Sequence, residues 1–373
     1  MNKRVDQLRE VMAEEGLDGF LVTDGMNRGY LSGFTGSSGA LLLTADEAYI
    51  ITDFRYFEQV GREAADWNLW KQRTNLDDAI AGLLKMHVPT RLGFEADAIT
   101  VASWEGLKEE APGSVEWVPT KGVVQGLRAV KSAEEIELIR RAQQITDEVA
   151  QQLPRLIQPG KQEKEVAWEL EVLLRDLGAD GPAFPITVAS GSNSALPHYK
   201  PGERRIEPDE IVLVDFGAKL NGYHSDMTRT YFTGEPTEQY TRVYQIVCDA
   251  LQKAEEELQA GYGAKAGDAI ARDFISEHGH GDDFGHGLGH GVGLEIHELP
   301  TLSFRAAEDA TLEVGNVVTI EPGIYLPGWG GIRIEDLALI TEDGVEVLTQ
   351  TPKEVRAWSG ERGAEGGRMK DEG

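Results

Sequence analysis

The chain has 373 residues, with 40% hydrophobic and 27% charged side chains, which is enough for two globular domains and excludes a single small module or wholesale disorder. Its 64 acidic and 36 basic residues leave a net charge of −28, which repels phosphate backbones and anionic membrane surfaces, so we expect no nucleic-acid or membrane partner. Cys248 is the only cysteine, and no apolar run reaches the roughly 18–20 residues needed to span a bilayer. We therefore expect a cytoplasmic protein.

Residues 1–127 are predicted to form an α/β domain. Val5, Leu8 and Met12 recur at helical spacing up to Gly16, and a short apolar run then indicates a buried strand. Helices and strands alternate after that point, as is typical of an α/β domain. The expected strands cover residues 17–23, 40–44, 48–53 and 91–95, and the expected helices cover 54–65 and 76–84.

Residues 128–358 are predicted to form a second domain of α+β class. Ser132 and Glu135 have the spacing of a capping box ahead of a long amphipathic helix, which marks the boundary. Residues 359–373 are rich in Gly, Glu and Arg, and we expect them to be a disordered tail. Further helices are expected at 163–177 and 238–259, and strands at 184–190, 211–220, 223–232, 314–323 and 331–341.

Two aspartates flank a predicted β-hairpin in the second domain. Asn221-Gly222 is a strong signal for a two-residue turn. Pairing outward from that turn places Gly217 opposite Asp226, so Asp215 and Asp226 share one face of the hairpin as diagonal neighbours about 7–8 Å apart. Two converging carboxylates beside an apolar run favour metal binding over a solvated strand face.

Histidines are concentrated in a glycine-rich segment, where five of the eight fall between His278 and His297. Alternating glycines from Gly285 to Gly293 argue against a helix and predict an irregular backbone that lets a ligand approach closely. We interpret His278 and His280 as structural residues of a polar loop. His286, His290 and His297 remain candidates for the site.

Two glutamates complete the acidic set. Glu321 ends an apolar run, and Glu335 lies within another, so both are expected to be buried and to need a partner. Arg333 could simply pair with Glu335, but it cannot neutralise all four carboxylates. Four carboxylates and one neutral imidazole around two divalent cations sum to zero charge. This oxygen-rich donor set favours Mn²⁺, with Co²⁺ or Zn²⁺ as alternatives.

The chain resembles the metallopeptidases of the pita-bread fold, and among them the Xaa-Pro peptidases aminopeptidase P and prolidase. The resemblance spans nearly the whole chain, including YLSGFTGSSGALLLT and ITDFRY, which are similar to a creatinase-like N-terminal domain. It rests on VDFG, SDMTRT, HGLGHGVGLEIHE, EPGIY and IRIED, which supply five metal ligands: Asp215, Asp226, His290, Glu321 and Glu335. It implies that Asp226 and Glu335 bridge both cations, that Asp215 completes one site, and that His290 and Glu321 complete the other.

The resemblance also implies the roles of the surrounding residues. Glu321 accepts or shuttles the proton of the attacking water, and His198 and His297 donate to the oxyanion. His286 holds the proline side of the substrate, and Arg333 orients Asp215 from outside the metal sites. Phe184 and Tyr325 are candidate walls of the proline pocket, although each could equally belong to the core.

We therefore expect a homodimeric Xaa-Pro aminopeptidase that acts on proline-containing peptides. The alternative is Xaa-Pro dipeptidase (prolidase). Thr301 stands where many prolidases have an arginine that grips the dipeptide carboxylate, which favours the aminopeptidase, whereas the nearby Arg305 keeps the dipeptidase open. Methionine aminopeptidase normally lacks such an N-terminal domain, and creatinase lacks the five ligands. A non-catalytic binding protein with this fold is expected to lose ligands, and here none is lost.

Overall fold

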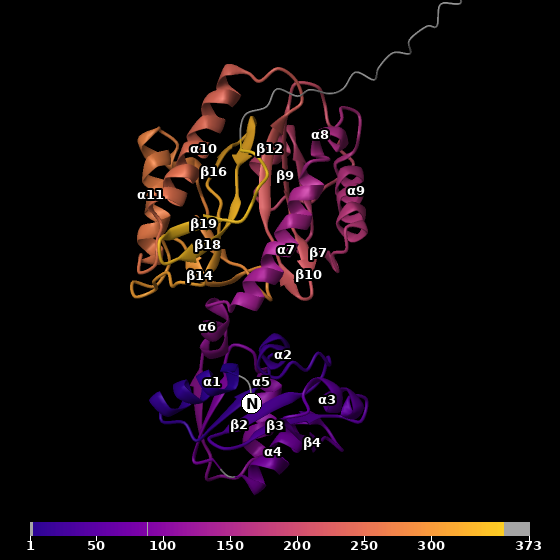
Figure 1. Ribbon diagram of the computed structural model, residues 1–373, viewed down its shortest axis with the longest axis vertical. Helices are drawn as coiled ribbons and strands as arrows, with labels where there is room; N and C mark the ends of the chain where they lie inside the picture. Colours follow the sequence, from indigo (N-terminus) through magenta and orange to yellow (C-terminus); the bar gives the residue numbers. More distant parts are fainter. Residues whose placement is uncertain (1–2, 88, 354–373) are drawn as a thin grey trace, which may run out of the picture. The chain divides into compact units, whose positions relative to one another are not determined.

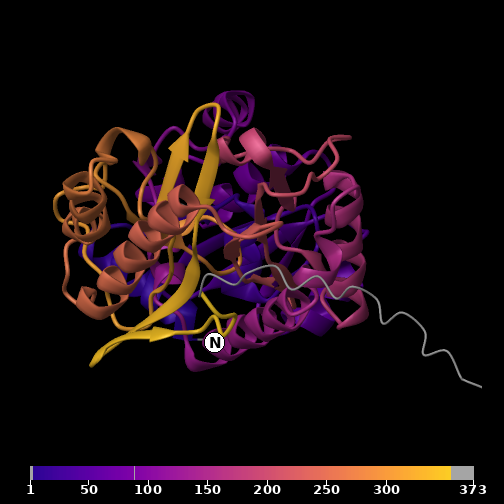
Figure 2. The same cartoon turned by 90° about the horizontal axis from the view of Figure 1, so that it is seen from above.

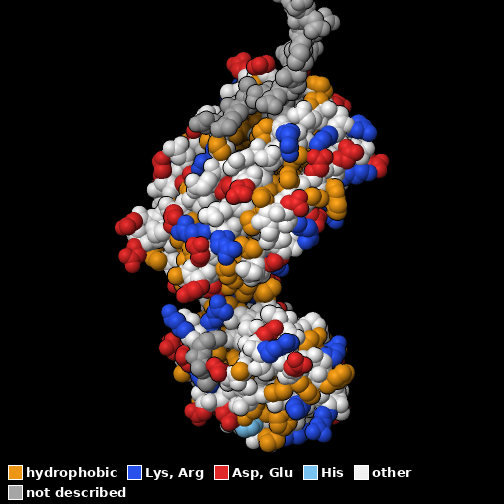
Figure 3. Space-filling model, turned by 45° about the vertical axis from the view of Figure 1, so that its right-hand side comes forward, with side chains coloured by type: hydrophobic (Ala, Val, Ile, Leu, Met, Phe, Trp, Pro, Cys, Tyr) orange, Lys and Arg blue, Asp and Glu red, His pale blue; other side chains and the backbone are white. Residues whose placement is uncertain are grey.

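A computed structural model describes residues 3–87 and 89–353, and the predicted tail at 359–373 lies outside these residues. The chain divides into two compact units, residues 1–128 and 129–373. No helix of the described residues is long and apolar enough to cross a membrane. Acidic and basic side chains are interspersed on the face of each unit that Figure 3 shows.

The first unit contains a six-stranded mixed sheet in the order β4-β3-β2-β1-β5-β6. Its central strands are wholly buried, and Leu21, Leu42, Ile51 and Leu92 pack with α4 and α5 in one core. The strands are β1 (Gly19–Val22), β2 (Ala40–Thr44), β3 (Ala48–Thr52), β4 (Asn68–Lys71), β5 (Arg91–Glu95) and β6 (Glu116–Thr120). The helices are α1 (Lys3–Glu14), α2 (Gly25–Ser32), α3 (Phe57–Glu63), α4 (Leu76–Met86), α5 (Val101–Glu110) and α6 (Val123–Ala129).

The second unit has small antiparallel sheets between two groups of helices (Figures 1 and 2). The helices are α7 (Ala133–Ala150), α8 (Leu153–Leu156), α9 (Glu163–Asp176), α10 (Glu238–Glu257) and α11 (Ala264–Glu277). Both views place α10 and α11 on one side of the strands and α8 and α9 on the other. The predicted capping box is confirmed at the start of α7, where Ser132 and Glu135 each accept from the other's backbone N–H.

Thirteen strands between residues 181 and 347 form the sheets of this unit. The first group is β7 (Gly181–Pro182), β8 (Thr187–Ser190), β9 (Ile211–Phe216), β10 (Ala218–Leu220), β11 (Tyr223–His224) and β12 (Met227–Phe232). The second group is β13 (Gly289–Gly291), β14 (Glu298–Leu302), β15 (Val317–Ile320), β16 (Gly323–Leu326), β17 (Gly330–Arg333), β18 (Asp336–Thr341) and β19 (Gly344–Val347). The sheets that matter for the site are β12-β9-β8, β14-β13-β15-β18-β19 and β16-β17.

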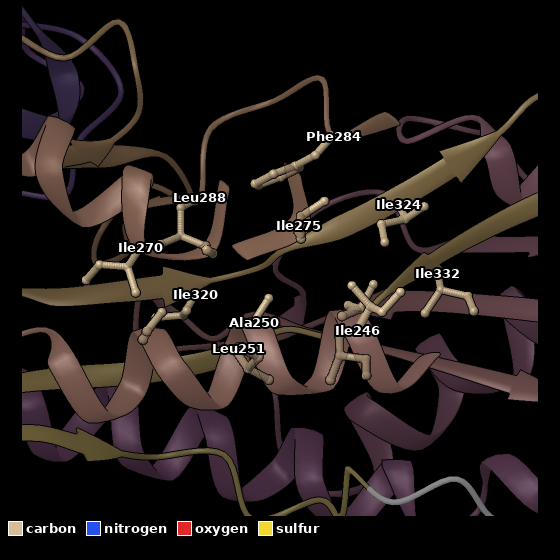
Figure 4. Packing of buried hydrophobic residues seen from close by; sticks show 14 of the residues in the cluster. Ile246, Ala250, Leu251, Ile270, Ile275, Phe284, Leu288, Ile320, Ile324 and Ile332 are labelled. Carbon is tan, nitrogen blue, oxygen red and sulfur yellow. The ribbon is translucent and has the colours of Figure 1, made fainter. Parts of the chain in front are cut away.

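Two of the apolar cores in this unit lie beside the strands of the site. In one of them, Ile246, Ala250 and Leu251 of α10 lie against Ile320 and Ile332 (Figure 4). In the other, buried side chains of α7 and α9 pack on β8 and β9. Both cores pack on strands that lead directly to predicted site residues.

The predicted hairpin register is confirmed. Leu220 pairs with Tyr223 and Phe216 with Met227, so one register runs through both halves of the hairpin. Asn221 and Gly222 have φ angles of 50° and 87°, as expected for a turn of type I′. The hairpin therefore places Asp215 and Asp226 where the sequence predicts.

Two expectations about the elements need correction. Residues 331–341 are not one strand: β17 pairs with β16, β18 pairs with β15, and Glu335 lies in the break between them. Helix α11 is also absent from the elements predicted above. The face that this helix buries includes Ala264, Gly267 and Ala271, whose small side chains give a weak apolar pattern.

Candidate metal centre

The hairpin of β9 and β12 carries the first two carboxylates. Asp215 is near the end of β9, and Asp226 immediately precedes β12. Between them, Gly217 lies so close to the opposite strand that an added Cβ atom would be 1.8 Å from the carbonyl oxygen of Ser225. Glycine at this position therefore allows the close strand approach that brings the two aspartates together.

Three more candidate ligands arrive from the second half of the unit. Asp226, His290 and Glu335 each offer one ligand atom, and these atoms lie within 4.8 Å of one another. His290 Nε2 is 3.7 Å from Asp226 Oδ2 and 3.5 Å from Glu321 Oε1. Four of the five ligands that the sequence suggests are therefore linked by short distances.

Burial gives this cluster unusual protonation properties. Burial, followed by repulsion from Glu335, raises the pKa of Asp226 well above its usual value. Burial and then Glu321 raise the pKa of Glu335 in the same direction. Burial raises the pKa of Glu321 to about 7. Burial also raises the pKa of Asp215, although Arg333 opposes this shift. Without cations, these carboxylates are therefore driven toward the protonated form.

The residues fit divalent cations. Asp215 Oδ1 is buried and has no hydrogen-bond partner among the described residues, so one hard oxygen donor is left for a ligand. Burial lowers the pKa of His290 to about 4, which keeps its imidazole neutral and able to coordinate. Carboxylate oxygens with one imidazole form a donor set suited to such ions.

Arg333 connects several parts of the site from β17. Its Nη2 donates to Asp215 Oδ2 at 2.6 Å, and its Nε donates to Thr228 Oγ1 at 3.0 Å. Its Nη1 donates to the hydroxyl of Tyr325 at 2.9 Å. The guanidinium thus holds one oxygen of Asp215 and leaves the other, Oδ1, available.

The remaining histidines surround the carboxylates. His286 Nε2 is hydrogen-bonded to the hydroxyl of Tyr325 at 2.9 Å. The rings of His290 and His297 are 4.3 Å apart, and Glu298, the residue after His297, forms a buried ion pair with Lys131. His198 is exposed in the loop after residues 191–195. Burial, followed by the proximity of His198, lowers the pKa of His297.

The two pocket candidates differ in their surroundings. Phe184 is half-buried in the bend between β7 and β8. Tyr325 is 8% exposed on β16, and its hydroxyl joins His286 to Arg333. Tyr325 is therefore part of the polar network as well as a candidate wall.

Sequence reasoning missed residues that hold the ligands in place. Thr228 Oγ1 donates to Glu335 Oε2 at 2.6 Å, and Thr319 Oγ1 contacts Glu321 Oε1 at 3.2 Å. Thr228 could have been found, because strand alternation puts it on the same face as Asp226. Arg272 of α11 pairs with Asp268 and donates to the carbonyl of His286 at 2.5 Å, a contact for which the sequence has no local signal.

The glycines beside His290 have a different function from the one predicted. Gly289 and Gly291 belong to the short strand β13, whose pairing with β14 shifts register between His290 and Gly291. A Cβ atom at Gly289 would lie 2.0 Å from the carbonyl oxygen of Thr319, and one at Gly291 would lie 2.2 Å from that of Leu299. These glycines therefore admit neighbouring backbone, not a ligand, and they pack β13 closely between β14 and β15.

Comparisons with known proteins identify the family of this chain. Residues 137–342 match metallopeptidase family M24, and residues 4–130 match the creatinase/prolidase N-terminal domain. A Xaa-Pro dipeptidase of Pyrococcus furiosus is 39% identical over 95% of this chain and 100% of its own length.

Solved structures give the same result. The structure of a Xaa-Pro dipeptidase from Bacillus anthracis is 42% identical, with a TM-score of 0.91, over 95% of this chain and 98% of the other. An X-Pro aminopeptidase from Thermotoga maritima MSB8 is 36% identical, with a TM-score of 0.83, over 91% and 97% of the two chains.

The fold and the site thus define a hydrolase that uses divalent metal ions. The chain belongs to metallopeptidase family M24, with a creatinase/prolidase N-terminal domain joined to a pita-bread catalytic domain. The predicted family and fold class are confirmed. On substrate, the comparisons favour the alternative, Xaa-Pro dipeptidase, over the aminopeptidase that the sequence analysis prefers.

Proposed function

We propose that this protein is a dinuclear metallopeptidase that hydrolyses Xaa-Pro dipeptides. The observation that carries the proposal is the convergence of Asp226, His290 and Glu335 within 4.8 Å, beside the unpaired Oδ1 of Asp215. Asp226 and Glu335 would bridge two cations, Asp215 would complete one site, and His290 and Glu321 the other. We propose Mn²⁺ as the metal, with Co²⁺ or Zn²⁺ as alternatives, because the donors are mainly hard oxygens.

The chain's own groups have separate tasks in this proposal. The bound cations supply Lewis acidity and a water activated near neutral pH. Glu321 accepts the proton of the attacking water and later passes it to the departing proline nitrogen. His198 and His297 donate to the oxyanion, and Arg333 keeps Asp215 oriented.

The proline side of the substrate is assigned to His286, with Phe184 and Tyr325 as walls. The hydroxyl of Tyr325 holds His286 Nε2, so the imidazole orientation is fixed by a residue of the same pocket. Because this nitrogen of His286 already has a hydrogen-bond partner, the imidazole and the aromatic face of Tyr325 are better suited to bind an apolar pyrrolidine ring than to bind a charged side chain.

A dipeptide also needs a partner for its free carboxylate, because a buried unpaired carboxylate is costly. Thr301 is exposed on β14 and carries no charge. The guanidinium of Arg305 lies 4.9 Å from the ring centre of Phe304, and that of Arg272 lies 4.6 Å from the same ring. Arg272 also donates to the carbonyl of His286, so the shared ring of Phe304 places Arg305 on the His286 side of the site. We therefore assign the binding of the dipeptide carboxylate to Arg305.

The test compares the specificity constants for a Xaa-Pro dipeptide and a Xaa-Pro-Yaa tripeptide. We expect the dipeptide to be preferred, and we expect Arg305→Gln to lower dipeptide kcat/KM at least about ten-fold, the effect of losing about 1.4 kcal/mol, while sparing the tripeptide. Arg242→Gln, at an exposed position on α10, is the matched control and should change neither. A wild-type preference for the tripeptide would establish the aminopeptidase instead.

A non-catalytic binding protein is the alternative from another class. Metal analysis of the purified protein, followed by chelation and restoration of peptide hydrolysis with Mn²⁺, separates the two. We also propose a cytoplasmic location, in keeping with the single cysteine. We propose in addition that the chain forms a homodimer. Light scattering at several protein concentrations tests the dimer.

A further inference from the structure

A chain of charged side chains, two of them buried and two partly buried, lies behind the metal centre, on the face of β12 opposite to Asp226. Arg229 is 2% exposed, and its Nη2 is 2.6 Å from Oδ1 of the fully buried Asp336. The other oxygen of Asp336 is 2.6 Å from Lys353 Nζ, which in turn is 2.8 Å from Glu255 Oε1 on α10. The four side chains connect β12, β18, α10 and the segment that follows β19.

The donors of Arg229 also hold main-chain oxygens on both sides of this cluster. Its Nη1 donates to the carbonyl of Glu335 at 2.6 Å and to that of Thr228 at 2.9 Å. Its Nη2 donates to the carbonyl of Thr351 at 2.6 Å, and its Nε donates to that of Pro352 at 3.3 Å. One guanidinium therefore ties two strands of the site to the segment of residues 349–353.

Glu335 is consequently fixed at three points by two neighbouring residues of β12. Its N–H donates to the carbonyl of Thr228 at 3.1 Å, and its Oε2 accepts from Thr228 Oγ1 at 2.6 Å. Its carbonyl oxygen accepts from Arg229. Since Glu335 lies in the break between β17 and β18, it has none of the ladder pairing that strand residues have, and these bonds take its place.

We propose that Arg229 is a positioning residue of the metal centre, which holds the peptide group of Glu335 so that its carboxylate can bridge two cations, and that Lys353 keeps Arg229 in place through Asp336. The inference rests on the proposed function, in which Glu335 is the bridging ligand. Such a ligand must be held within about 0.5 Å to serve two cations about 3.5–4 Å apart.

The fixed fork of a guanidinium is needed here because it meets five acceptors in different directions. A lysine would keep the charge opposite Asp336 but has three donors on a flexible stem. Arg229→Lys therefore separates positioning from charge. Removing an outer partner of a metal ligand typically weakens metal binding 10–100-fold.

The experiment titrates metal-free protein with Mn²⁺ by calorimetry and with Co²⁺ by visible absorption. For Arg229→Lys we expect at least about ten-fold weaker binding of the second ion, an altered Co²⁺ spectrum, and a lower kcat with little change in KM. Lys353→Met, which leaves Arg229 in place, should shift both titrations in the same direction by a smaller amount. If Arg229→Lys does not fold, Lys353→Met decides the question.

Arg28→Lys is the matched control. Arg28 is also buried and donates to two backbone carbonyls, those of Gly36 and Gly39, but it belongs to the first unit. It should lower the melting temperature without changing the titrations. Wild-type affinity and spectrum in Arg229→Lys and Lys353→Met would overturn the inference. A wild-type protein that fails to bind two ions would instead overturn the proposed metal centre.

Discussion

Charging the buried carboxylates of the candidate metal centre costs free energy when no cation is bound. This cost distinguishes the cluster from ordinary ion pairs. Arg333 contacts Asp215 at 2.6 Å, so the simple pairing of Arg333 with Glu335 that the sequence left open is not what the structure shows. Glu335 has Thr228 as its side-chain hydrogen-bond donor and is repelled by Glu321 and Asp215. The negative charge of Glu335 therefore needs a cation to neutralise it.

The first prediction concerns the proposed bridging residues. Asp226→Asn and Glu335→Gln should each abolish hydrolysis and remove most of the bound metal, because a neutral amide replaces the charge shared by two ions. Elemental analysis after equilibration with Mn²⁺ measures metal content, and circular dichroism checks that the fold is kept. Near-normal metal content and turnover in either variant would contradict the assignment.

The second prediction concerns His297, which we place on the oxyanion. His297→Ala should lower kcat by about 10²–10³, the loss typical of one oxyanion donor, while both cations stay bound. Single-turnover kinetics together with metal analysis test this. A metal-free variant would show that His297 is a ligand, and the role of His290 would then need revision.

At the scale of the elements, the site depends on close strand approach. The hairpin of β9 and β12 brings Asp215 and Asp226 to one face only because Gly217 leaves room for the backbone of Ser225. The same principle applies to β13, where neighbouring strands fill the space beside Gly289 and Gly291. Small residues in these strands thus set the distances between ligands.

The third prediction follows from this packing. Gly217→Ala places a methyl group 1.8 Å from a backbone oxygen and should cost at least the 1–3 kcal/mol typical of overpacking, with loss of metal binding. Urea denaturation and Mn²⁺ titration measure the two effects. Gly61→Ala is the control: it lies in α3 with no atom within 4 Å of the added Cβ, and it should stabilise by up to about 1 kcal/mol. Equal effects of the two substitutions would refute the argument.

At the scale of the whole molecule, metal and proton compete for the same buried carboxylates. Their pKa values are raised in the metal-free protein, so their contribution to stability is complete below the ordinary carboxyl pKa and is lost as pH rises through the folded-state pKa, which is about 7 for Glu321. Cations remove this loss by binding the charged form. Metal should therefore stabilise the protein more as pH rises.

The fourth prediction states this as a measurement. Between pH 5 and pH 8, the melting temperature of metal-free protein should fall, and the difference between Mn²⁺-loaded and metal-free protein should widen. The double variant Asp226→Asn/Glu335→Gln, measured without metal, should fall less steeply because two of the repelling charges are gone. A loaded-minus-free difference that stays constant across this pH range would show that the carboxylates are not ligands.

The sequence by itself determined much of this protein. Local signals sufficed for the capping box at Ser132 and Glu135 and for the turn at Asn221-Gly222, because each depends on residues only a few positions apart. Strand alternation then placed Asp215 and Asp226 on one face. The four carboxylates stand out because buried acidic residues are rare, whereas the choice of His290 among three candidate histidines rests on the family resemblance.

Only the tertiary structure decided what surrounds those ligands. The break at Glu335 is visible only in the folded chain. The contacts of Arg229 with the carbonyls of Glu335 and Thr351 join segments that are far apart in the chain, and Arg272 on α11 holds the carbonyl of His286 in the loop before β13. A hydrogen bond between such segments leaves no periodic pattern in either of them. The sequence could therefore predict candidate ligands and reacting groups, whereas the packing of α10, α11 and the strands determined which residues hold them in position.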